Sequence, residues 1–443
     1  MTTNQVQTDT VARLLRQTVE THREGVGLGV YSVCSAHPWV LEAAMLQAFD
    51  DGDYVLVEAT SNQVDQFGGY TGMTPAAFRD FVHRVADGVG LPRERIVLGG
   101  DHLGPNRWQD LPAAEAMARA EDLVAAYVRA GYVKIHLDCS MSCADDPTPL
   151  TDEITSERSA RLAKVAEAAC PRGGQPWPLY VVGTEVPVPG GAHEAIVELT
   201  PTDADGARAT LAAHRAAFEA LGLQDAWSRV IGLVVQPGVE FDHLRVVDYD
   251  RSRTGRLRAV LDDYPGLVFE AHSTDYQTAE NLRALVEDHW AILKVGPGLT
   301  FALREALFAL ARIEDDLVDP SERSRLIEVI DERMVAEPES WAAYYEGTAR
   351  EVRLARRFSY SDRMRYYWPD PVIEAAVDLL IDNLRTTGVP LPMLSQHLPE
   401  QYSRVRRGEL APDPRSIVVD HVRDALRPYG AACRARSLEG ALR

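Results

Sequence analysis

Eight apolar, strand-like runs, each followed by a segment with helical periodicity, constrain the fold of this chain more than any other feature. Successive βα units are typical of parallel sheets joined by helical crossovers, and eight such units close a barrel. The sequence therefore predicts an α/β protein built on a (β/α)8 TIM barrel. The predicted strands are Val26–Ser35, Tyr54–Asn62, Ile96–His102, Val133–Ser140, Leu179–Glu185, Val230–Gly238, Leu267–Thr274 and Ala291–Gly298.

Helical segments follow the predicted strands, and several carry start signals. Thr74 precedes Pro75, where a hydroxyl can cap the first helical turn and proline fits inside it. A short amphipathic helix, Asp9–His22, comes before the first strand, and we expect it to cover the barrel bottom. The predicted wall helices are Pro38–Phe49, Pro75–Val89, Ala113–Ala130, Ser156–Ala169, Asp203–Leu221, Ser252–Tyr264, Thr278–Asp288 and Thr300–Ile313.

The length of the chain points to a second region. Its 443 residues exceed the roughly 250 of a bare barrel, and the βα alternation ceases after Asp319-Pro320. Residues 1–318 are therefore predicted to form the barrel with its N-terminal helix, and residues 319–443 a helical C-terminal extension packed on it. The helices expected in the extension are Glu322–Val335, Pro338–Arg353, Pro371–Leu384 and Ser416–Leu426.

Composition narrows the function classes. A formal charge of −20 argues against nucleic acid as a partner, since phosphate backbones require a basic surface. The chain has no apolar stretch near the ~20 residues of a membrane span and no signal-peptide pattern at its start. Five cysteines without CxxC spacing are typical of reduced thiols. We expect a cytoplasmic, oligomeric protein with a small-molecule substrate, no membrane association and no nucleic-acid partner.

Polar side chains gather where the predicted strands end. Side chains two residues apart face the same way along a strand, which pairs Glu58 with Thr60, His136 with Asp138, and Glu270 with His272. Ionisable pairs are costly in strands buried on both faces unless they serve a ligand or neutralise each other. Because the carboxyl ends of barrel strands form one rim, where active sites lie, these pairs predict an active site there.

Asp101-His102 is the sharpest of these pairs, because it offers a carboxylate base beside an imidazole ligand. His102, His272 and a carboxylate, Glu185 or Glu240, would make a plausible site for a divalent metal, Zn²⁺ or Mn²⁺. Asp101 and Glu185 are the candidate catalytic residues. Taken singly, each histidine fits a structural role better than that of a ligand, so the metal prediction depends on all of them ending strands of one barrel.

Two further rim features allow two interpretations each. Lys294 could form a Schiff base with a ketose carbonyl, or could simply pair with Glu270 or Asp138, which is the favoured interpretation. Gly296 opens the last barrel helix, where backbone N–H groups often hold phosphate. The full set of predicted substrate-binding residues is Glu58, Asn62, Gln63, His136, Asp138, Gln236, Glu270, Ser273, Lys294, Gly296, Arg363 and Tyr366.

Two segments outside the strands are also candidate parts of the substrate site. The glycine-rich stretch Thr60–Thr74 is predicted to be a rim loop that folds over substrate, although a plain surface loop is the alternative. Arg357–Pro371 crowds arginine and aromatic residues together in an otherwise acidic chain. Such a cluster suits a sugar or a phosphate, and it would equally suit docking of the extension on the barrel.

Long motifs of the chain resemble the GatZ/KbaZ family over nearly the whole length. The matching stretches are GVYSVCSAHPWVLEAA, VEATSNQVDQFGGYTGMTPAAF, LGGDHLGPNRWQ, VKIHLDCSM, VVQPGVEFDH, FEAHSTDYQ, LKVGPGLTFALREALFAL and SYSDRMRYYWPDP. The resemblance implies the non-catalytic, stabilising subunit of class II D-tagatose-1,6-bisphosphate aldolase, and the family's relatives include enzymes that epimerise ketoses at C4.

A more distant resemblance to class II aldolases themselves bears on the metal. Those enzymes use an Asp-His pair after strand three and histidines after strands six and seven to hold zinc. Asp101-His102 and His272 match that pattern, but the strand-six position reads Val235-Gln236-Pro237-Gly238 where a histidine would stand. This departure means either loss of the metal or a different site completed by Glu240 or Glu185.

Three functional hypotheses follow. The first is an aldolase subunit that binds ketose or ketose phosphate and stabilises a separate class II aldolase catalytic subunit. The second is a metal-dependent ketose 4-epimerase, acting on tagatose, fructose or their phosphates by retro-aldol and aldol chemistry. The third is a purely structural barrel whose polar rim is a relic.

Overall fold

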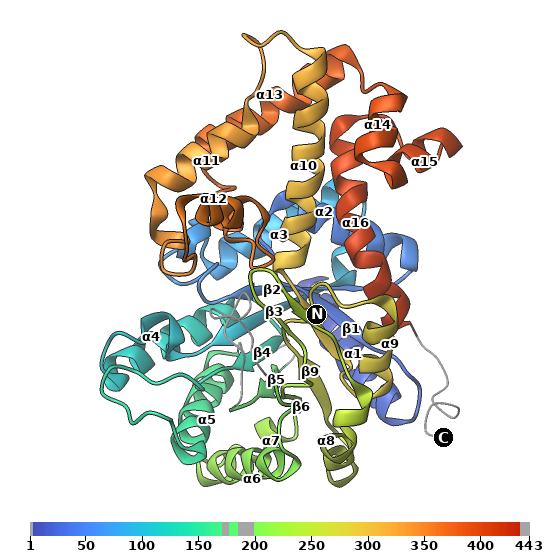
Figure 1. Ribbon diagram of the computed structural model, residues 1–443. Coiled ribbons are helices and arrows are strands. Elements are labelled where there is room, and N and C mark those ends of the chain that lie inside the picture. The colour runs from blue at the N-terminus through green and yellow to red at the C-terminus, as the bar shows by residue number, and fades with distance from the viewer. Residues whose placement is uncertain (1–2, 171–176, 185–198, 435–443) are drawn as a thin grey trace.

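Eight parallel strands close a barrel, as predicted, in the order β1-β10-β9-β6-β5-β4-β3-β2 (Figure 1). The computed structural model describes residues 3–170, 177–184 and 199–434. The strands are β1 (Val30–Val33), β2 (Val55–Thr60), β3 (Ile96–Leu103), β4 (Lys134–Leu137), β5 (Leu179–Val182), β6 (Val230–Val234), β9 (Val268–Ala271) and β10 (Ile292–Val295). All eight are buried along their whole length, which explains their nearly uninterrupted apolar sequences.

The bottom of the barrel is covered by α1 (Thr3–Arg23), as the sequence predicts. Leu15 and Val19 of this helix belong to one buried cluster with inward-facing strand residues such as Val97 and Ile231. The bottom of the barrel is therefore apolar, and the polar side chains lie at the opposite, carboxyl-terminal end of the strands.

The wall helices follow the predicted order with small shifts at their ends. They are α2 (Pro38–Asp51), α3 (Pro75–Val89), α4 (Ala113–Arg129), α5 (Asp152–Ala169), α6 (Ala204–Ala220), α9 (Ala279–Glu287) and α10 (Pro297–Leu317). The helix α5 begins before the predicted Ser156, because the hydroxyl of Thr151 caps it by accepting from the backbone N–H of Ile154. A single helix over Ser252–Tyr264 is wrong: Gly255–Arg258 (α8) lies between two 3-10 turns.

The C-terminal region is helical, as expected, but its elements differ in detail. It contains α11 (Leu326–Ala336), α12 (Ala349–Phe358), α13 (Pro371–Thr387), α14 (Leu391–His397), α15 (Pro399–Arg407) and α16 (Pro414–Cys433). The predicted helix Pro338–Arg353 is wrong over most of its length. A capping box formed by Thr348 and Glu351 starts the real helix eleven residues later than Pro338, at Ala349.

The helix α16 completes the wall of the barrel. It packs against α2, α9 and β1, while α10 rises away from the strands beside it (Figure 1). The backbone N–H of Gly29 donates to the carbonyl of Cys433 at 3.0 Å, which ties the end of α16 to the start of β1. The region after residue 318 therefore forms part of the barrel itself, because its helix α16 packs against α2, α9 and β1.

Two smaller observations complete the fold. A two-stranded antiparallel sheet, β7 (Glu240–Phe241) with β8 (Val246–Val247), stands beside the barrel mouth between β6 and β9 in the chain. Among the helices that the structure describes, none is both long and apolar enough to cross a membrane.

Candidate active site

A small pocket of about 70 Å³ opens at the carboxyl-terminal end of the barrel strands. Its wall combines acidic, basic and amide side chains with a few apolar ones, which suits a hydroxylated ligand. A chamber of about 510 Å³, bounded by α2, the Thr60–Thr74 segment and α13, adjoins the pocket and shares Cys34, Gln63 and Tyr70 with it. The pocket is lined by Cys34, Thr60, Asn62, Gln63, Tyr70, Asp101, His102, Phe241, His272, Ser273, Asp275, Lys294, Val295, Gly296, Pro297, Arg365 and Tyr366.

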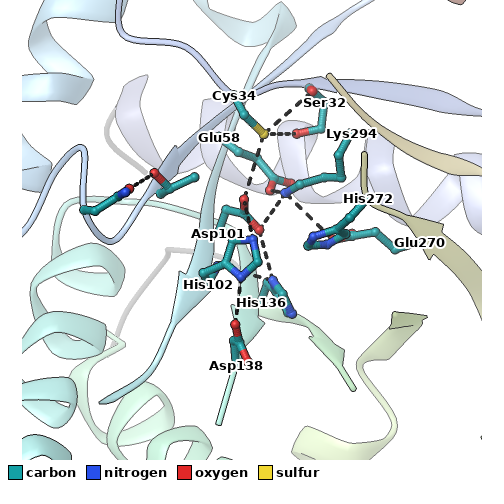
Figure 2. Close-up of polar contacts among 12 residues, drawn as sticks. Ser32, Cys34, Glu58, Asp101, His102, His136, Asp138, Glu270, His272 and Lys294 are labelled. Carbon is teal, nitrogen blue, oxygen red and sulfur yellow. Dashed lines mark hydrogen bonds and ion pairs between the residues drawn. The ribbon is translucent and has the colours of Figure 1, made fainter. Parts of the chain in front are cut away.

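The floor of the pocket is a buried network of opposite charges (Figure 2). The Nζ atom of Lys134 lies 2.5 Å from Oε1 of Glu58 and 2.7 Å from Oε2 of Glu270, and all three side chains are fully buried. Lys294 contacts Glu58 as well, and its Nζ lies 2.7 Å from Oδ1 of Asp101. The chain has only three lysines, so two of them are committed to this one network.

Three histidines stand above this network with their ring centres 4.9 to 5.2 Å apart. His102 contributes Nδ1 to a 2.7 Å contact with Oδ2 of Asp138. The Nε2 atom of His272 lies 2.9 Å from Oε1 of Glu270, which fixes the orientation of that ring. His136 comes from β4, and its Nδ1 lies 3.0 Å from Oδ1 of Asp101. The third imidazole, which the position of Gln236 after β6 lacks, is therefore supplied by β4, two strands away in the barrel.

His102 leaves β3 in a left-handed conformation, with φ of 49°. The pairing of β3 with β4 shifts register between Gly100 and Leu103, at the same place. Non-glycine residues adopt positive φ at a cost in conformational energy. This kink directs both Asp101 and His102 into the pocket, although they are adjacent in a strand and would otherwise point to opposite faces.

Neighbouring charges shift the pKa values of Asp101 and Lys294 in favour of their ionised forms. Burial by itself would raise the pKa of Asp101, but the charges of His102 and Lys294 outweigh it and keep that pKa well below its usual value. Burial would lower the pKa of Lys294, yet Asp101 and the acidic groups around it raise that pKa well above its usual value. A protonated lysine is not nucleophilic, so the site favours ion pairing over a Schiff base at Lys294.

The network also fits a divalent cation. Donor atoms of Asp101, His136, Glu270 and His272 all lie within 4.8 Å of one another. Imidazole and carboxylate donors are those that Zn²⁺ and Mn²⁺ accept. The Nε2 atom of His136 is buried and has no hydrogen-bond partner among the described residues. Burial lowers the pKa of His272 to about 4, which keeps that ring neutral, as a metal ligand must be.

The charge balance of the cluster supports the same conclusion. The four carboxylates are Glu58, Asp101, Asp138 and Glu270, and the two ammonium groups belong to Lys134 and Lys294. Two negative charges therefore remain, which protonation of a histidine or a bound cation must offset. His102 can take one proton, because its two carboxylate neighbours raise its pKa against the effect of burial.

The structure brings most of the predicted site residues together. Those that line the pocket are Asn62, Gln63, Asp101, His102, His272, Ser273, Lys294, Gly296 and Tyr366. Those that form the buried floor are Glu58, His136, Asp138 and Glu270. Glu185, predicted as a catalytic residue or a ligand, lies outside the described residues.

Three predicted residues, Gln236, Arg363 and Glu240, do not line the pocket. The side-chain oxygen of Gln236 accepts from the N–H groups of Gly238 and Val239, so it closes its own loop and does not line the pocket. Arg363 lies with its guanidinium over the ring of Tyr344, 3.1 Å from the ring centre, behind the pocket wall.

Glu240, on β7, accepts from the N–H of Phe241 and is not among the four clustered donors. His102 is not among them either, and its Nδ1 contacts Asp138. Their roles as metal ligands stay predictions. Burial raises the pKa of Glu240 to about 7, which gives the rim a carboxyl group that titrates near neutral pH.

Sequence reasoning missed Lys134 and Asp275. Arg363 and Arg365 of the Arg357–Pro371 cluster were both candidates for a phosphate, and Arg365 is the one that lines the pocket. Lys134 carries a readable signal, since it stands two residues before His136 on the same face of β4. Arg365 replaces Arg363 because both lie in a 3-10 turn, Arg363–Tyr366, where residues two apart point in different directions. Asp275 follows His272 closely, but nothing in its sequence surroundings marks it.

The N-terminus of α10 is filled by that aspartate. Oδ1 of Asp275 accepts from the backbone N–H groups of Gly296 and Gly298, at 2.9 and 2.8 Å. Its carboxylate is buried, with 3% of the residue exposed. The position predicted to hold a substrate phosphate therefore already holds a carboxylate of the chain.

Part of the predicted rim loop does reach the pocket. Tyr70 packs edge-on against Tyr366, with ring centres 4.9 Å apart, and so joins the loop after β2 to the C-terminal region. The phenol oxygen of Tyr366 accepts from Nη1 of Arg363 and Nη2 of Arg365, at 3.2 and 2.9 Å. The arginine and aromatic cluster of Arg357–Pro371 thus serves both the docking of the extension and the pocket wall.

Comparisons with known proteins identify the family. A solved structure from Sinorhizobium meliloti 1021, described as a probable tagatose 6 phosphate kinase, is 52% identical, with a TM-score of 0.84 over 91% of this chain and 100% of that one. The YdjI aldolase from Escherichia coli K12 is 11% identical, with a TM-score of 0.40 over 85% of this chain and 96% of that one. A fructose-bisphosphate aldolase from Campylobacter jejuni is also 11% identical, with a TM-score of 0.43 over 84% and 92%.

The family model described as D-tagatose-1,6-bisphosphate aldolase subunit GatZ/KbaZ-like matches residues 15–434, nearly the whole chain. This chain belongs to the GatZ/KbaZ-like family of D-tagatose-1,6-bisphosphate aldolase subunits.

Proposed function

We propose that the barrel binds a ketose of the tagatose type in the pocket at its carboxyl-terminal end, and that the chain works beside a class II aldolase catalytic subunit. The observation that carries this proposal is the buried network beneath the pocket, in which Lys134 and Lys294 lie against the carboxylates of Glu58, Asp101 and Glu270. A purely structural barrel has no need for buried charges, which typically cost several kcal/mol per ion to desolvate.

Asp101, His136, Glu270 and His272 would hold the divalent cation. When bound, the cation supplies Lewis-acid stabilisation of negative charge on ketose oxygens. Glu58 and Lys134 do not belong to this donor set. Their role is to fix Glu270, whose other oxygen orients His272.

The remaining pocket residues match the hydroxyl groups of a sugar. Asn62, Gln63 and Ser273 offer amide and hydroxyl groups that can donate and accept hydrogen bonds. Asp101 is an ionised base at the wall, and Lys294 places a fixed positive charge beside it. Negative charge that develops on a substrate oxygen near Lys294 would be stabilised without reorganisation of the site.

A second candidate is ketose 4-epimerisation by the chain itself, favoured by the presence of a base and a fixed cation in its own pocket. A carboxylate, Asp101 or Glu185, would remove the proton from O4, and the C3–C4 bond would break to give an aldehyde and an enediolate. After the aldehyde turns over, the bond re-forms at C3 and O4 recovers its proton. The same bond is broken in aldol cleavage, so the two activities differ in whether the aldehyde leaves.

The test is to incubate the purified chain with D-tagatose, D-fructose and their phosphates, with Mn²⁺, Zn²⁺ or EDTA, and to follow ketose products and triose release together. Interconversion of ketoses that EDTA abolishes would support the epimerase. Binding without turnover, with triose release only after a class II aldolase subunit is added, would support the accessory role. Absence of ketose binding under all conditions would overturn both.

Two histidine variants, one in the proposed metal site and one outside it, test whether ketose binding depends on that site. His136→Gln should lower bound metal and ketose affinity together, because it removes a donor of the cluster. His214→Gln is the control, since His214 is equally buried but lies on α6, where its Nδ1 contacts the carbonyl of Thr210. Equal metal content in the two variants, measured by elemental analysis, would remove His136 from the proposed donor set.

A further inference from the structure

Asp275 occupies the place at which a barrel of this kind would hold a phosphate. Phosphate sites in TIM barrels are commonly built from the loops after the seventh and eighth strands and a helix N-terminus. Here β9 and β10 are those strands, and Asp275 lies in the loop after β9. Its Oδ1 takes both N–H groups offered by Gly296 and Gly298 at the start of α10.

The backbone around Asp275 is constrained to keep it there. Ser273 and Tyr276, on either side of it, have φ of 54° and 66°, in the left-handed region that non-glycine residues rarely adopt. Such strain persists only where surrounding contacts impose it. The phenol of Tyr429 on α16 donates to the carbonyl of Thr274 at 2.7 Å, and the phenol of Tyr276 donates to the carbonyl of Tyr360 at 2.6 Å.

Other groups at this end of the pocket are also committed within the chain. The hydroxyl of Thr300, in the first turn of α10, donates to the buried carboxylate of Asp362. Arg365, the pocket arginine, donates to the carbonyls of Ser361 and Asp362 and to the phenol of Tyr366. Two carboxylates therefore surround the helix N-terminus, and the nearest guanidinium already has partners on both of its terminal nitrogens.

We propose that Asp275 is a specificity-determining residue: it stands in for a phosphate at the start of α10, so that this pocket selects an unphosphorylated ketose over its phosphate esters. This inference rests on the proposed ketose binding and names the substrate class. An entering phosphate would meet a buried carboxylate of like charge and find the backbone N–H groups taken. Recognition of a phosphorylated ketose would then belong to the catalytic partner subunit.

Two variants and a matched control test this assignment by calorimetric titration with D-tagatose, its 1-phosphate, its 6-phosphate and inorganic phosphate. Asp275→Ser frees both N–H groups and removes the charge, whereas Asp275→Asn removes the charge but keeps an oxygen that can accept from both. The control is Asp242→Ser. Asp242 is a buried carboxylate that also accepts two backbone N–H groups, at 2.7 and 2.8 Å, but it does not line the pocket.

The wild-type chain should bind D-tagatose at least tenfold more tightly than either phosphate. Asp275→Ser should reduce that preference at least tenfold and should bind inorganic phosphate, Asp275→Asn should show a smaller reduction, and Asp242→Ser should keep the wild-type preference. Equal affinity of the wild type for free and phosphorylated ketose, or an unchanged preference in both Asp275 variants, would overturn the inference while leaving ketose binding intact.

Inorganic phosphate separates this inference from the proposed function. If no ketose binds to any variant, the proposed function fails, but phosphate binding by Asp275→Ser and not by the wild type would still support the role of Asp275. Phosphate binding at the pocket of the wild type, or by neither protein, would overturn that role.

Discussion

Replacing Lys134 by methionine should destabilise the barrel from its centre. The ammonium group of Lys134 lies 2.5 and 2.7 Å from carboxylate oxygens of Glu58 and Glu270, with all three side chains fully buried. At an effective dielectric constant of about 20, each pair is worth about 6 kcal/mol before desolvation is subtracted. Desolvation offsets most of this, and removing one partner of a buried ion pair typically costs about 3–5 kcal/mol. We expect K134M to lose that much unfolding free energy.

Thermal unfolding followed by circular dichroism measures the loss. For a chain of 443 residues, about 1 kcal/mol corresponds to about 1 °C in Tm, so the expected decrease is about 3–5 °C. Adding Glu270→Gln to Lys134→Met should recover part of it, because Glu270 loses its close cation, whereas Glu58 keeps its contact with Lys294. Lys164→Met, at an exposed position of α5, is the control and should leave Tm unchanged.

The pH dependence gives a second, independent check. A carboxylate left unpaired in the barrel has a raised pKa, so the folded variant binds a proton that the unfolded chain releases. Its deficit against the wild type should therefore shrink as the pH falls from 8 toward 5, in the window between the unfolded and the raised pKa. A Tm equal to that of the wild type at every pH, or a double variant no more stable than K134M, would refute the reasoning.

Three further outcomes are expected. Borohydride reduction in the presence of ketose should leave Lys294 unmodified in peptide mass spectra, because its raised pKa keeps it protonated; a covalent adduct there would contradict this. The pair of His22 and His289, whose ring nitrogens lie 3.0 Å apart, should destabilise the fold as the pH falls from about 6.5 toward 4. Burial lowers the pKa of both rings to about 4, so only the unfolded chain takes up protons in that window. His22→Asn should make the decrease of Tm with acidity shallower, and an unchanged slope would argue against the pair. A chain ending at Asp413, which lacks α16, should lose cooperative thermal unfolding, and a sharp transition close to that of the full chain would contradict the role of α16 in the barrel wall.

Much of the barrel and part of the active site could be predicted, because both follow from the alternation of side chains along each strand. The alternation of side chains along a strand placed Glu58, His136 and Glu270 on the inward face, and strand polarity placed their neighbours on one rim. The same rule reaches Lys134, which was missed only because the pairs were sought at the polar ends of the strands.

Other features depend on contacts that no local pattern records. Asp275 reaches the start of α10 through two left-handed residues, Ser273 and Tyr276, whose sequence alone does not favour that conformation. The third imidazole comes from β4, and only the closed barrel places His136 beside His272. The choice of Arg365 over Arg363 likewise depends on how a short 3-10 turn docks against the barrel.

The position of α16 bears on how the protein is made. The strand β1, against which α16 packs, leaves the ribosome long before α16, which follows all the other described strands and helices. Until it emerges, the nascent barrel exposes the apolar flank of β1 that α16 later covers, a state open to aggregation and to chaperones. The phenol of Tyr429 also reaches Thr274, beside Asp275. The pocket is thereby complete only once α16 is in place, and a nascent chain interrupted before α16 carries no finished site.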